Sequence, residues 1–122
     1  MQPNIPVAVV DDDASVRYAL ENLLSSAGFV STLFESAEEF LASADLGNIF
    51  CLILDLRLPG MSGLDLQQRL QELGATIPVI FISGHGDEDA RAMALQGGAV
   101  AFLHKPFTDR SLLEAIKSIG GA

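Results

Sequence analysis

Hydrophobic and polar residues along the chain follow two alternating patterns. Short runs of apolar, β-branched and aromatic residues, bounded by turn residues, predict strands that are buried in a core. Between these runs, apolar residues recur three and four positions apart, which predicts amphipathic helices. In the third helix this spacing places Leu66, Leu70 and Leu73 on one side. The predicted strands are Ile5–Val10, Phe29–Phe34, Ile49–Leu54, Pro78–Ile82 and Val100–Leu103.

Capping residues and glycines mark where the helices begin and end. Asp13 is a natural N-cap of the first helix, and Gly28 ends that helix. Ser36 and Glu39 have the spacing of a capping box, in which each side chain accepts a backbone hydrogen bond at the start of a helix. The other three helices are predicted to begin near Gly63, Asp87–Asp89 and Thr108 or Asp109, and to end at Gly74, Gly97–Gly98 and Gly120–Gly121.

Five strand–helix units in series, with short connections and no internal repeat or linker, indicate one domain over the 122 residues. Continuous apolar strands that alternate with amphipathic helices predict a parallel sheet covered by helices on both faces. Because crossovers between parallel strands are right-handed, few topologies remain. We expect the flavodoxin-like, three-layer α/β fold with strand order 2-1-3-4-5 and five helices.

The charge and composition narrow the classes of partner. A net charge of −9, from 16 acidic and 7 basic residues, opposes nucleic-acid binding by this domain and favours a cation site or a basic protein partner. No apolar run is long enough to span a membrane and no signal peptide opens the chain, so we expect a cytoplasmic protein without membrane contact. The one cysteine, Cys51, is interpreted as a small buried hydrophobic residue that forms no internal disulfide.

Polar side chains gather where the predicted strands end. Because the carboxyl ends of parallel strands meet at one edge of a sheet, we expect these side chains to lie together. Strands 1 and 3 are neighbours in the expected order, so their carboxylates are crowded and repel one another. A hard divalent cation with oxygen ligands relieves that repulsion, which predicts a Mg²⁺ site. The residues are Asp11, Asp12 and Asp13 after the first strand, Asp55 after the third, Ser83 after the fourth and Lys105 after the fifth.

A carboxylate, a metal, an ammonium and a hydroxyl at one point suit a phosphoryl group, whose oxygens need positive partners and hydrogen-bond donors. Asp55 can be the nucleophile that forms an aspartyl phosphate. Each residue alone also has a plain structural interpretation: Asp55 and Asp11–Asp13 as capping groups, and Lys105 and Ser83 as ordinary turn residues. Their joint position at successive strand ends favours the chemical site.

Four motifs resemble those of a known family. They are V-V-D-D-D at Val9–Asp13, L-D-L-R-L-P-G-M-S-G at Leu54–Gly63, I-S-G-H-G at Ile82–Gly86 and F-L-H-K-P-F at Phe102–Phe107. In this order and spacing they resemble the receiver domains of two-component response regulators, in the CheY-like superfamily. The resemblance covers the whole chain. I-S-G-H-G-D and K-P-F are most similar to the FixJ-type subgroup of transcriptional regulators.

The resemblance assigns a role to each matching residue. It makes Asp55 the phosphoacceptor, and it makes Asp11 and Asp12 the acidic pair, with Asp12 favoured as the direct Mg²⁺ ligand. Arg57 stands where the family donates a backbone carbonyl to the metal. Lys105 matches the lysine that contacts the phosphoryl group.

The resemblance also implies a switch. Ser83 matches the switch hydroxyl and Phe102 the switch aromatic, although threonine and tyrosine are the commoner residues at these two positions. The face that the switch reshapes contains the fifth strand with Ala90–Leu95 and Ser111–Ile119, and in the family it often forms a homodimer after phosphorylation. The resemblance further implies a cis Lys105–Pro106 peptide bond, and X-Pro bonds are the only ones for which the cis form costs little.

The implied function is that of a phosphorelay switch. A sensor histidine kinase transfers its phosphoryl group to Asp55, and the protein catalyses only its own phosphorylation and dephosphorylation. The receiver domain is expected to span residues 1–122. The DNA-binding output domain that a FixJ-type regulator implies is expected to lie outside these residues, so DNA binding is expected only through that domain.

Two alternatives come from other classes of protein. A Mg²⁺-dependent phosphohydrolase with an aspartate nucleophile resembles a D-x-D pattern whose second aspartate is the acid/base, and Arg57 occupies that position here. A degenerate receiver that acts only as a protein-binding module lacks an acidic residue, the acceptor or the lysine, and this chain has all of them.

Overall fold

A computed structural model describes residues 5–84 and 88–120. Within these residues the chain forms five strands, five α-helices and one short 3₁₀ helix, Leu46–Asn48. The strands are β1 (Ile5–Val10), β2 (Phe29–Phe34), β3 (Cys51–Asp55), β4 (Val79–Ser83) and β5 (Ala101–His104). The α-helices are α1 (Ala14–Ser26), α2 (Ala37–Ser43), α3 (Gly63–Glu72), α4 (Glu88–Gln96) and α5 (Asp109–Gly120).

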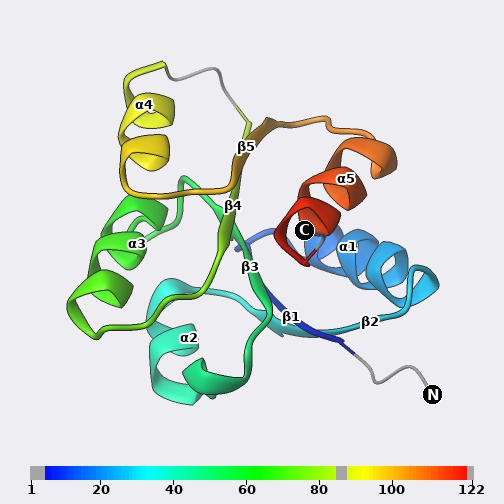
Figure 1. The fold of residues 1–122 in the computed structure, drawn as a ribbon, viewed down its shortest axis with the longest axis horizontal. Coiled ribbons are helices and arrows are strands. Elements are labelled where there is room, and N and C mark those ends of the chain that lie inside the picture. The colour runs from blue at the N-terminus through cyan, green and yellow to red at the C-terminus, as the bar shows by residue number, and fades with distance from the viewer. Residues whose placement is uncertain (1–4, 85–87, 121–122) are drawn as a thin grey trace.

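The five strands are all parallel and lie in the order β2-β1-β3-β4-β5. Figure 1 shows α1 and α5 on one side of this sheet and α2, α3 and α4 on the other. The predicted flavodoxin-like fold and strand order are therefore confirmed. β1 and β3 are hydrogen-bonded neighbours, with Val10 opposite Leu54, so the segments that follow both strands leave the sheet side by side.

The core has two halves because successive side chains of a strand point to opposite faces. Val7, Val9 and Ile53 pack with the apolar side chains of α1 and α5. Val10 and Leu54 belong to the cluster under α2, α3 and α4. Cys51, fully buried on the α1/α5 face, is the small hydrophobic residue that the sequence indicated, and burial raises the pKa of its thiol to about 12.

The third, fourth and fifth strands begin one or two residues later than predicted. Ile49 lies outside the third strand because the 3₁₀ helix precedes it and the pairing with β1 begins at Cys51. Pro78 has no N–H for the sheet, and β4 begins at Val79. Val100 likewise precedes β5, and each of the three strands ends one residue further along than predicted.

Two predicted N-caps are present. The Asp13 carboxylate accepts the Ser15 N–H at 2.9 Å at the start of α1. At the start of α5, the Thr108 hydroxyl accepts the Ser111 N–H at 3.0 Å, so Thr108 rather than Asp109 is the cap.

The capping box predicted for α2 is only half formed. The Ser36 hydroxyl accepts the Glu39 N–H at 3.0 Å, but the Glu39 carboxylate accepts the N–H of Glu35 rather than that of Ser36. A complete capping box is found instead at the start of α3, between Ser62 and Asp65. The aspartate there forms the reciprocal bond that glutamate more often provides.

The prediction that Leu73 shares the buried side of α3 is wrong. Leu66 and Leu70 are buried, whereas Leu73 is 50% exposed. α3 ends at Glu72, and the chain turns away at Gly74, whose φ of +76° favours glycine. Leu73 therefore follows the last residue of the helix and does not continue its buried apolar side.

Some predicted features lie outside the described residues. They are the loop residues His85 and Gly86, the start of the fourth helix at Asp87, and Gly121 as the end of the last helix. Among the helices of residues 5–84 and 88–120, none is both long and apolar enough to cross a membrane.

Gly63 is a position where only glycine fits. A Cβ there would lie 2.5 Å from the Asp55 carbonyl oxygen and 3.0 Å from the Leu56 Cα, and backbone atoms cannot move aside easily. We therefore expect Gly63→Ala to lower the free energy of unfolding by about 1–3 kcal/mol in urea titrations. Gly47→Ala is the control, because the nearest side-chain atom is 4.0 Å away, and it should change stability by less than about 0.5 kcal/mol. Equal unfolding midpoints for both variants would contradict this account.

Candidate functional site

Three carboxylates meet at the carboxyl end of the sheet. Asp11 and Asp12 follow β1, and Asp55 ends the neighbouring β3. One carboxylate oxygen from each lies within 4.8 Å of the others. Asp11 is fully buried, Asp55 is 5% exposed and Asp12 is exposed, so the cluster opens to solvent on one side only. The structure therefore brings together the three acids that the sequence placed at one edge.

Asp11 is held in place through its backbone and its side chain. Its N–H donates to the Phe34 carbonyl at 3.2 Å, and its Oδ1 accepts the Asp13 N–H at 2.8 Å. The Arg17 Nη1 donates to the Asp11 carbonyl oxygen at 2.8 Å. Sequence reasoning missed Arg17, although a basic residue in the helix that follows an acidic strand end is a signal that could have found it.

Lys105 supplies the positive charge of the site. Its Nζ lies 3.1 Å from the Asp11 Oδ2 and 3.6 Å from the Asp55 Oδ2. The backbone N–H of Lys105 donates to the Ser83 carbonyl at 2.6 Å, which fixes the backbone after β5 to the end of β4. The Lys105–Pro106 bond is cis, as predicted.

The electrostatics of the cluster follow from burial and like charge. Burial, and then the negative charge of Asp11, raise the pKa of Asp55 to about 6, and the opposing effect of Lys105 only reduces the rise. Burial acts to lower the pKa of Lys105, but its hydrogen bond to Asp11 and the charges of Asp11 and Asp55 outweigh that effect, so its pKa is raised. Lys105 thus stays charged, while Asp55 is destabilised as an anion in the metal-free site.

The Arg57 backbone lies beside the reactive carboxylate, since its N–H donates to the Asp55 Oδ1 at 3.3 Å. Its side chain is exposed. The predicted use of its carbonyl as a metal ligand remains a prediction.

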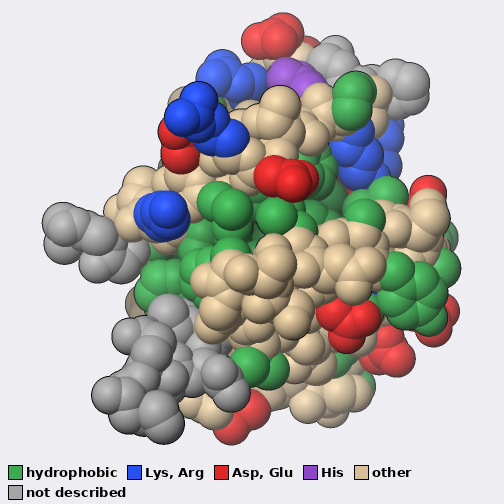
Figure 2. All heavy atoms as spheres, turned by 90° about the vertical axis from the view of Figure 1, so that its right-hand side faces the viewer, with side chains coloured by type: hydrophobic (Ala, Val, Ile, Leu, Met, Phe, Trp, Pro, Cys, Tyr) green, Lys and Arg blue, Asp and Glu red, His purple; other side chains and the backbone are tan. Residues whose placement is uncertain are grey.

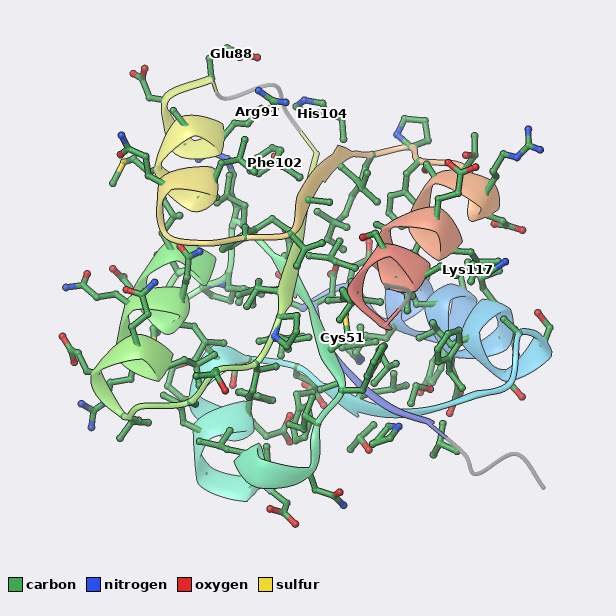
Figure 3. The ribbon with its side chains drawn as sticks, viewed as in Figure 1. Cys51, Glu88, Arg91, Phe102, His104 and Lys117 are labelled. Atoms are coloured by element: carbon green, nitrogen blue, oxygen red, sulfur yellow. The ribbon has the colours of Figure 1, made fainter. Side chains whose placement is uncertain are left out.

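Ser83 and Phe102 belong to the face of the sheet that α2, α3 and α4 cover. By alternation, Ser83 shares the face of Phe81, and Phe81 lies opposite Phe102 in the sheet register. The Phe102 ring, 9% exposed, packs 6.2 Å from the Phe81 ring and edge-on to His104 at 5.5 Å. Figure 3 shows Phe102 between β5 and α4. Ser83 is fully buried, so both predicted switch residues lie inward in this structure.

The donor set of the cluster fits a hard divalent cation. Carboxylate oxygens are the ligands that Mg²⁺ prefers, and three of them converge here from two strand ends. The partly open side, at Asp12, leaves room for the water molecules that Mg²⁺ retains.

The family description "response regulator receiver domain" matches residues 7–117. The chain belongs to the receiver domains of response regulators, and its function is in phosphorelay signalling. The family resemblance of the four motifs is thereby confirmed, and nothing among the relatives supports the phosphohydrolase alternative.

Regulators of the predicted subgroup are among the similar proteins. Nodulation protein W of Bradyrhizobium diazoefficiens is 51% identical over 110 residues, which cover 90% of this chain and 48% of the relative. The response regulator protein TodT of Pseudomonas putida is 47% identical over 112 residues, 92% of this chain and 49% of the relative. The transcriptional regulatory protein FixJ of B. diazoefficiens is 40% identical, with coverages of 92% and 55%. The chain thus spans about half the length of these relatives.

Solved structures agree with this assignment. The response regulator StyR has a TM-score of 0.89 and 46% identity, over 95% of this chain and 59% of that one. FixJ-N has a TM-score of 0.86 and 39% identity, over 97% and 94% of the two chains.

The raised pKa of Asp55 predicts a pH dependence of stability in the metal-free protein. With a pKa of about 6 in the folded protein, against the ordinary 3.8, Asp55 contributes stability that is complete below pH 3.8 and is lost progressively as the pH rises through about 6. In urea titrations with EDTA, Asp55→Asn should lack this loss and exceed the parent's stability near pH 7.5 by at most about 3 kcal/mol. Parallel pH profiles for parent and variant would show that Asp55 is not destabilised by its surroundings.

Proposed function

We propose that this receiver domain accepts a phosphoryl group on Asp55 from the phosphohistidine of a sensor histidine kinase. An Asp55 carboxylate oxygen attacks the phosphorus as the bond from phosphorus to the histidine nitrogen breaks. The observation that supports this proposal is the placement of Lys105, whose Nζ lies within 3.6 Å of Asp55 and 3.1 Å of Asp11. An ammonium there can stabilise the charge on the transferred phosphoryl oxygens.

Asp11, Asp12 and Asp55, with the Arg57 backbone carbonyl, are the groups that would hold Mg²⁺. When bound, the ion supplies positive charge that offsets the phosphoryl oxygens. The chain's own contribution is to keep these oxygens together against their mutual repulsion, through the bonds that Asp11 makes with Asp13, Phe34 and Lys105.

An apolar groove beside the site suits docking of the kinase. It has a volume of about 520 Å³, and Lys105 is among the residues that line it. Figure 2 shows hydrophobic side chains in the middle of the face that carries α1 and α5. We assign the docking of the kinase to this groove, which is lined by Ser15, Val16, Ala19, Leu20, Leu23, Lys105, Pro106, Phe107 and Asp109.

The relay proposed for the phosphorylated protein runs through Ser83 and Phe102. A phosphoryl oxygen on Asp55 draws the Ser83 hydroxyl toward it by a charge-assisted hydrogen bond, and the Phe102 ring turns into the space that this movement leaves. A large ring with two discrete positions is the two-state element that a switch needs. The reshaped face of α4, β5 and α5 then forms a homodimer.

The output of this switch is control of transcription, exerted by a DNA-binding domain that is separate from the 1–122 receiver domain. The name of the relative FixJ, a transcriptional regulatory protein, supports this choice. We place the protein in the cytoplasm, where such a domain meets DNA. The degenerate-receiver alternative is disfavoured, since the acids and the lysine that it would lack form one cluster.

The proposed acceptor is tested by Asp55→Asn. With acetyl phosphate and Mg²⁺, the parent should gain one phosphoryl group by intact-mass measurement, and the variant should gain none because the nucleophilic oxygen pair is lost. Asp45→Asn, an exposed acid before the 3₁₀ helix, is the control and should behave as the parent. A full phosphoryl adduct on the Asp55 variant would refute the assignment.

The proposed relay is tested by Ser83→Ala with beryllofluoride, a phosphoryl mimic. The variant should bind the mimic yet stay monomeric in sedimentation runs in which the mimic converts the parent to a dimer. Ser26→Ala is the control, because the Ser26 hydroxyl only donates to the Leu23 carbonyl at the end of α1. Dimerisation of the Ser83 variant to the parent's extent would mean that the signal does not pass through Ser83.

A further inference from the structure

The loop after Asp55, residues 56–62, carries the backbone that lies beside the reactive carboxylate. We call it the β3–α3 loop. Arg57 in this loop donates its N–H to the Asp55 Oδ1 at 3.3 Å. The Gly63 N–H closes the loop by donating to the Leu56 carbonyl at 3.0 Å, and the Ser62 cap of α3 fixes the loop's last residue. Between Arg57 and Ser62, a contact with another part of the chain can also fix the position of this loop.

Glu38, in the first turn of α2, provides that restraint from another part of the chain. Its Oε2 accepts the Met61 N–H at 2.8 Å, across 23 residues of sequence. Gly60 makes room for this contact, because a Cβ at position 60 would lie 2.5 Å from the same Oε2. Gly60 also has a φ of +76°, a backbone conformation that residues with a side chain rarely adopt. The carboxylate and the glycine therefore fit together as one contact.

The contact with Met61 favours the ionised form of Glu38. The Met61 N–H, and then the N–H of Glu38 itself, lower the pKa of the Glu38 carboxyl. Glu38 is exposed, so the packing of its side chain in a core does not account for its position. Its neighbour Glu39 accepts the Glu35 N–H at 2.7 Å, within the α2 region alone.

We infer that Glu38 is a positioning residue for the Asp55 site: it holds the β3–α3 loop so that the Arg57 backbone stays against the Asp55 carboxylate. This inference rests on the proposed phosphorylation of Asp55. Loss of the contact frees the middle of the loop, and the Arg57 N–H and carbonyl then spend less time in the positions that the reaction uses.

The test compares Glu38→Ala, Glu38→Asp and Glu38→Gln with the control Glu39→Ala. Alanine removes the acceptor, aspartate keeps the charge but is one methylene too short to reach, and glutamine keeps an acceptor oxygen at full length. Two quantities are measured: hydrogen exchange of the Met61 and Arg57 amides by NMR, and the rate of phosphorylation by acetyl phosphate at fixed Mg²⁺. Urea midpoints show how much fold stability each variant has lost.

Glu38→Ala and Glu38→Asp should speed exchange at both amides and slow phosphorylation by about threefold to tenfold, the size expected for the net contribution of one solvent-exposed hydrogen bond. Glu38→Gln should recover most of the parent rate, and Glu39→Ala should match the parent. If the alanine variant does not fold, the aspartate variant gives the answer.

The inference is overturned if the alanine and aspartate variants phosphorylate at the parent rate, or if Glu39→Ala slows the reaction as much as they do. It is also overturned if Met61 and Arg57 exchange as in the parent. Absence of phosphorylation in the parent itself would instead refute the proposed function. The exchange data alone would then decide whether Glu38 holds the loop.

Discussion

The structure depends on the crowding of like charges at the ends of two adjacent strands. Parallel pairing of β1 with β3 places the carboxylates of Asp11, Asp12 and Asp55 within 4.8 Å of one another, two of them nearly shielded from water. Without compensation such a cluster would favour protonation, and the raised pKa of Asp55 is the sign of that tendency. Lys105 compensates in part, and the remaining negative charge of the cluster suits a divalent cation. The fold therefore holds these three carboxylates together in spite of their electrostatic repulsion.

Because successive side chains of a strand point to opposite faces, the acidic cluster and the predicted switch residues belong to different faces of the sheet. Continuing the alternation of β1 and β3 assigns Asp11 and Asp55 to the α1/α5 face, where the apolar groove opens beside Lys105. The same alternation in β4 and β5 assigns Ser83 and Phe102 to the face covered by α4. A phosphoryl group at the sheet edge would lie between the two faces. This arrangement explains how one side of the sheet can serve a phosphoryl donor while the other carries the proposed relay.

Sequence reasoning was accurate for the order of the elements and for the acidic cluster at the strand ends, and it failed for some individual hydrogen-bond partners and for the point at which a helix stops. The strand order, the helix caps at Asp13 and Thr108 and the acidic cluster all follow from periodicity, capping residues and the meeting of strand ends. The spacing of Ser36 and Glu39 predicted a full capping box, but the Glu39 carboxylate bonds one residue earlier, a choice among neighbouring N–H groups that spacing cannot decide. Leu73 kept the helical spacing although the helix stops before it. Glu38 escaped notice because its partner, the Met61 backbone N–H, lies 23 residues away in the sequence, and spacing along the chain does not indicate such a contact. Arg17, which donates to the Asp11 carbonyl, was missed although its place in the helix after an acidic strand end could have indicated it.

The central claim is that Asp11, Asp12 and Asp55 form a cation site whose repulsion Mg²⁺ relieves. The most direct measurement is the free energy of unfolding of the parent and of Asp12→Ala as Mg²⁺ is titrated into the metal-free proteins. Asp12 is the exposed member, so its removal leaves the buried Asp11–Lys105 pair in place. The parent should gain about 2.7 kcal/mol at a hundredfold excess of Mg²⁺ over its Kd, and the variant should lose most of that gain. A parent whose stability does not respond to millimolar Mg²⁺, or a variant that gains as much as the parent, would contradict the account.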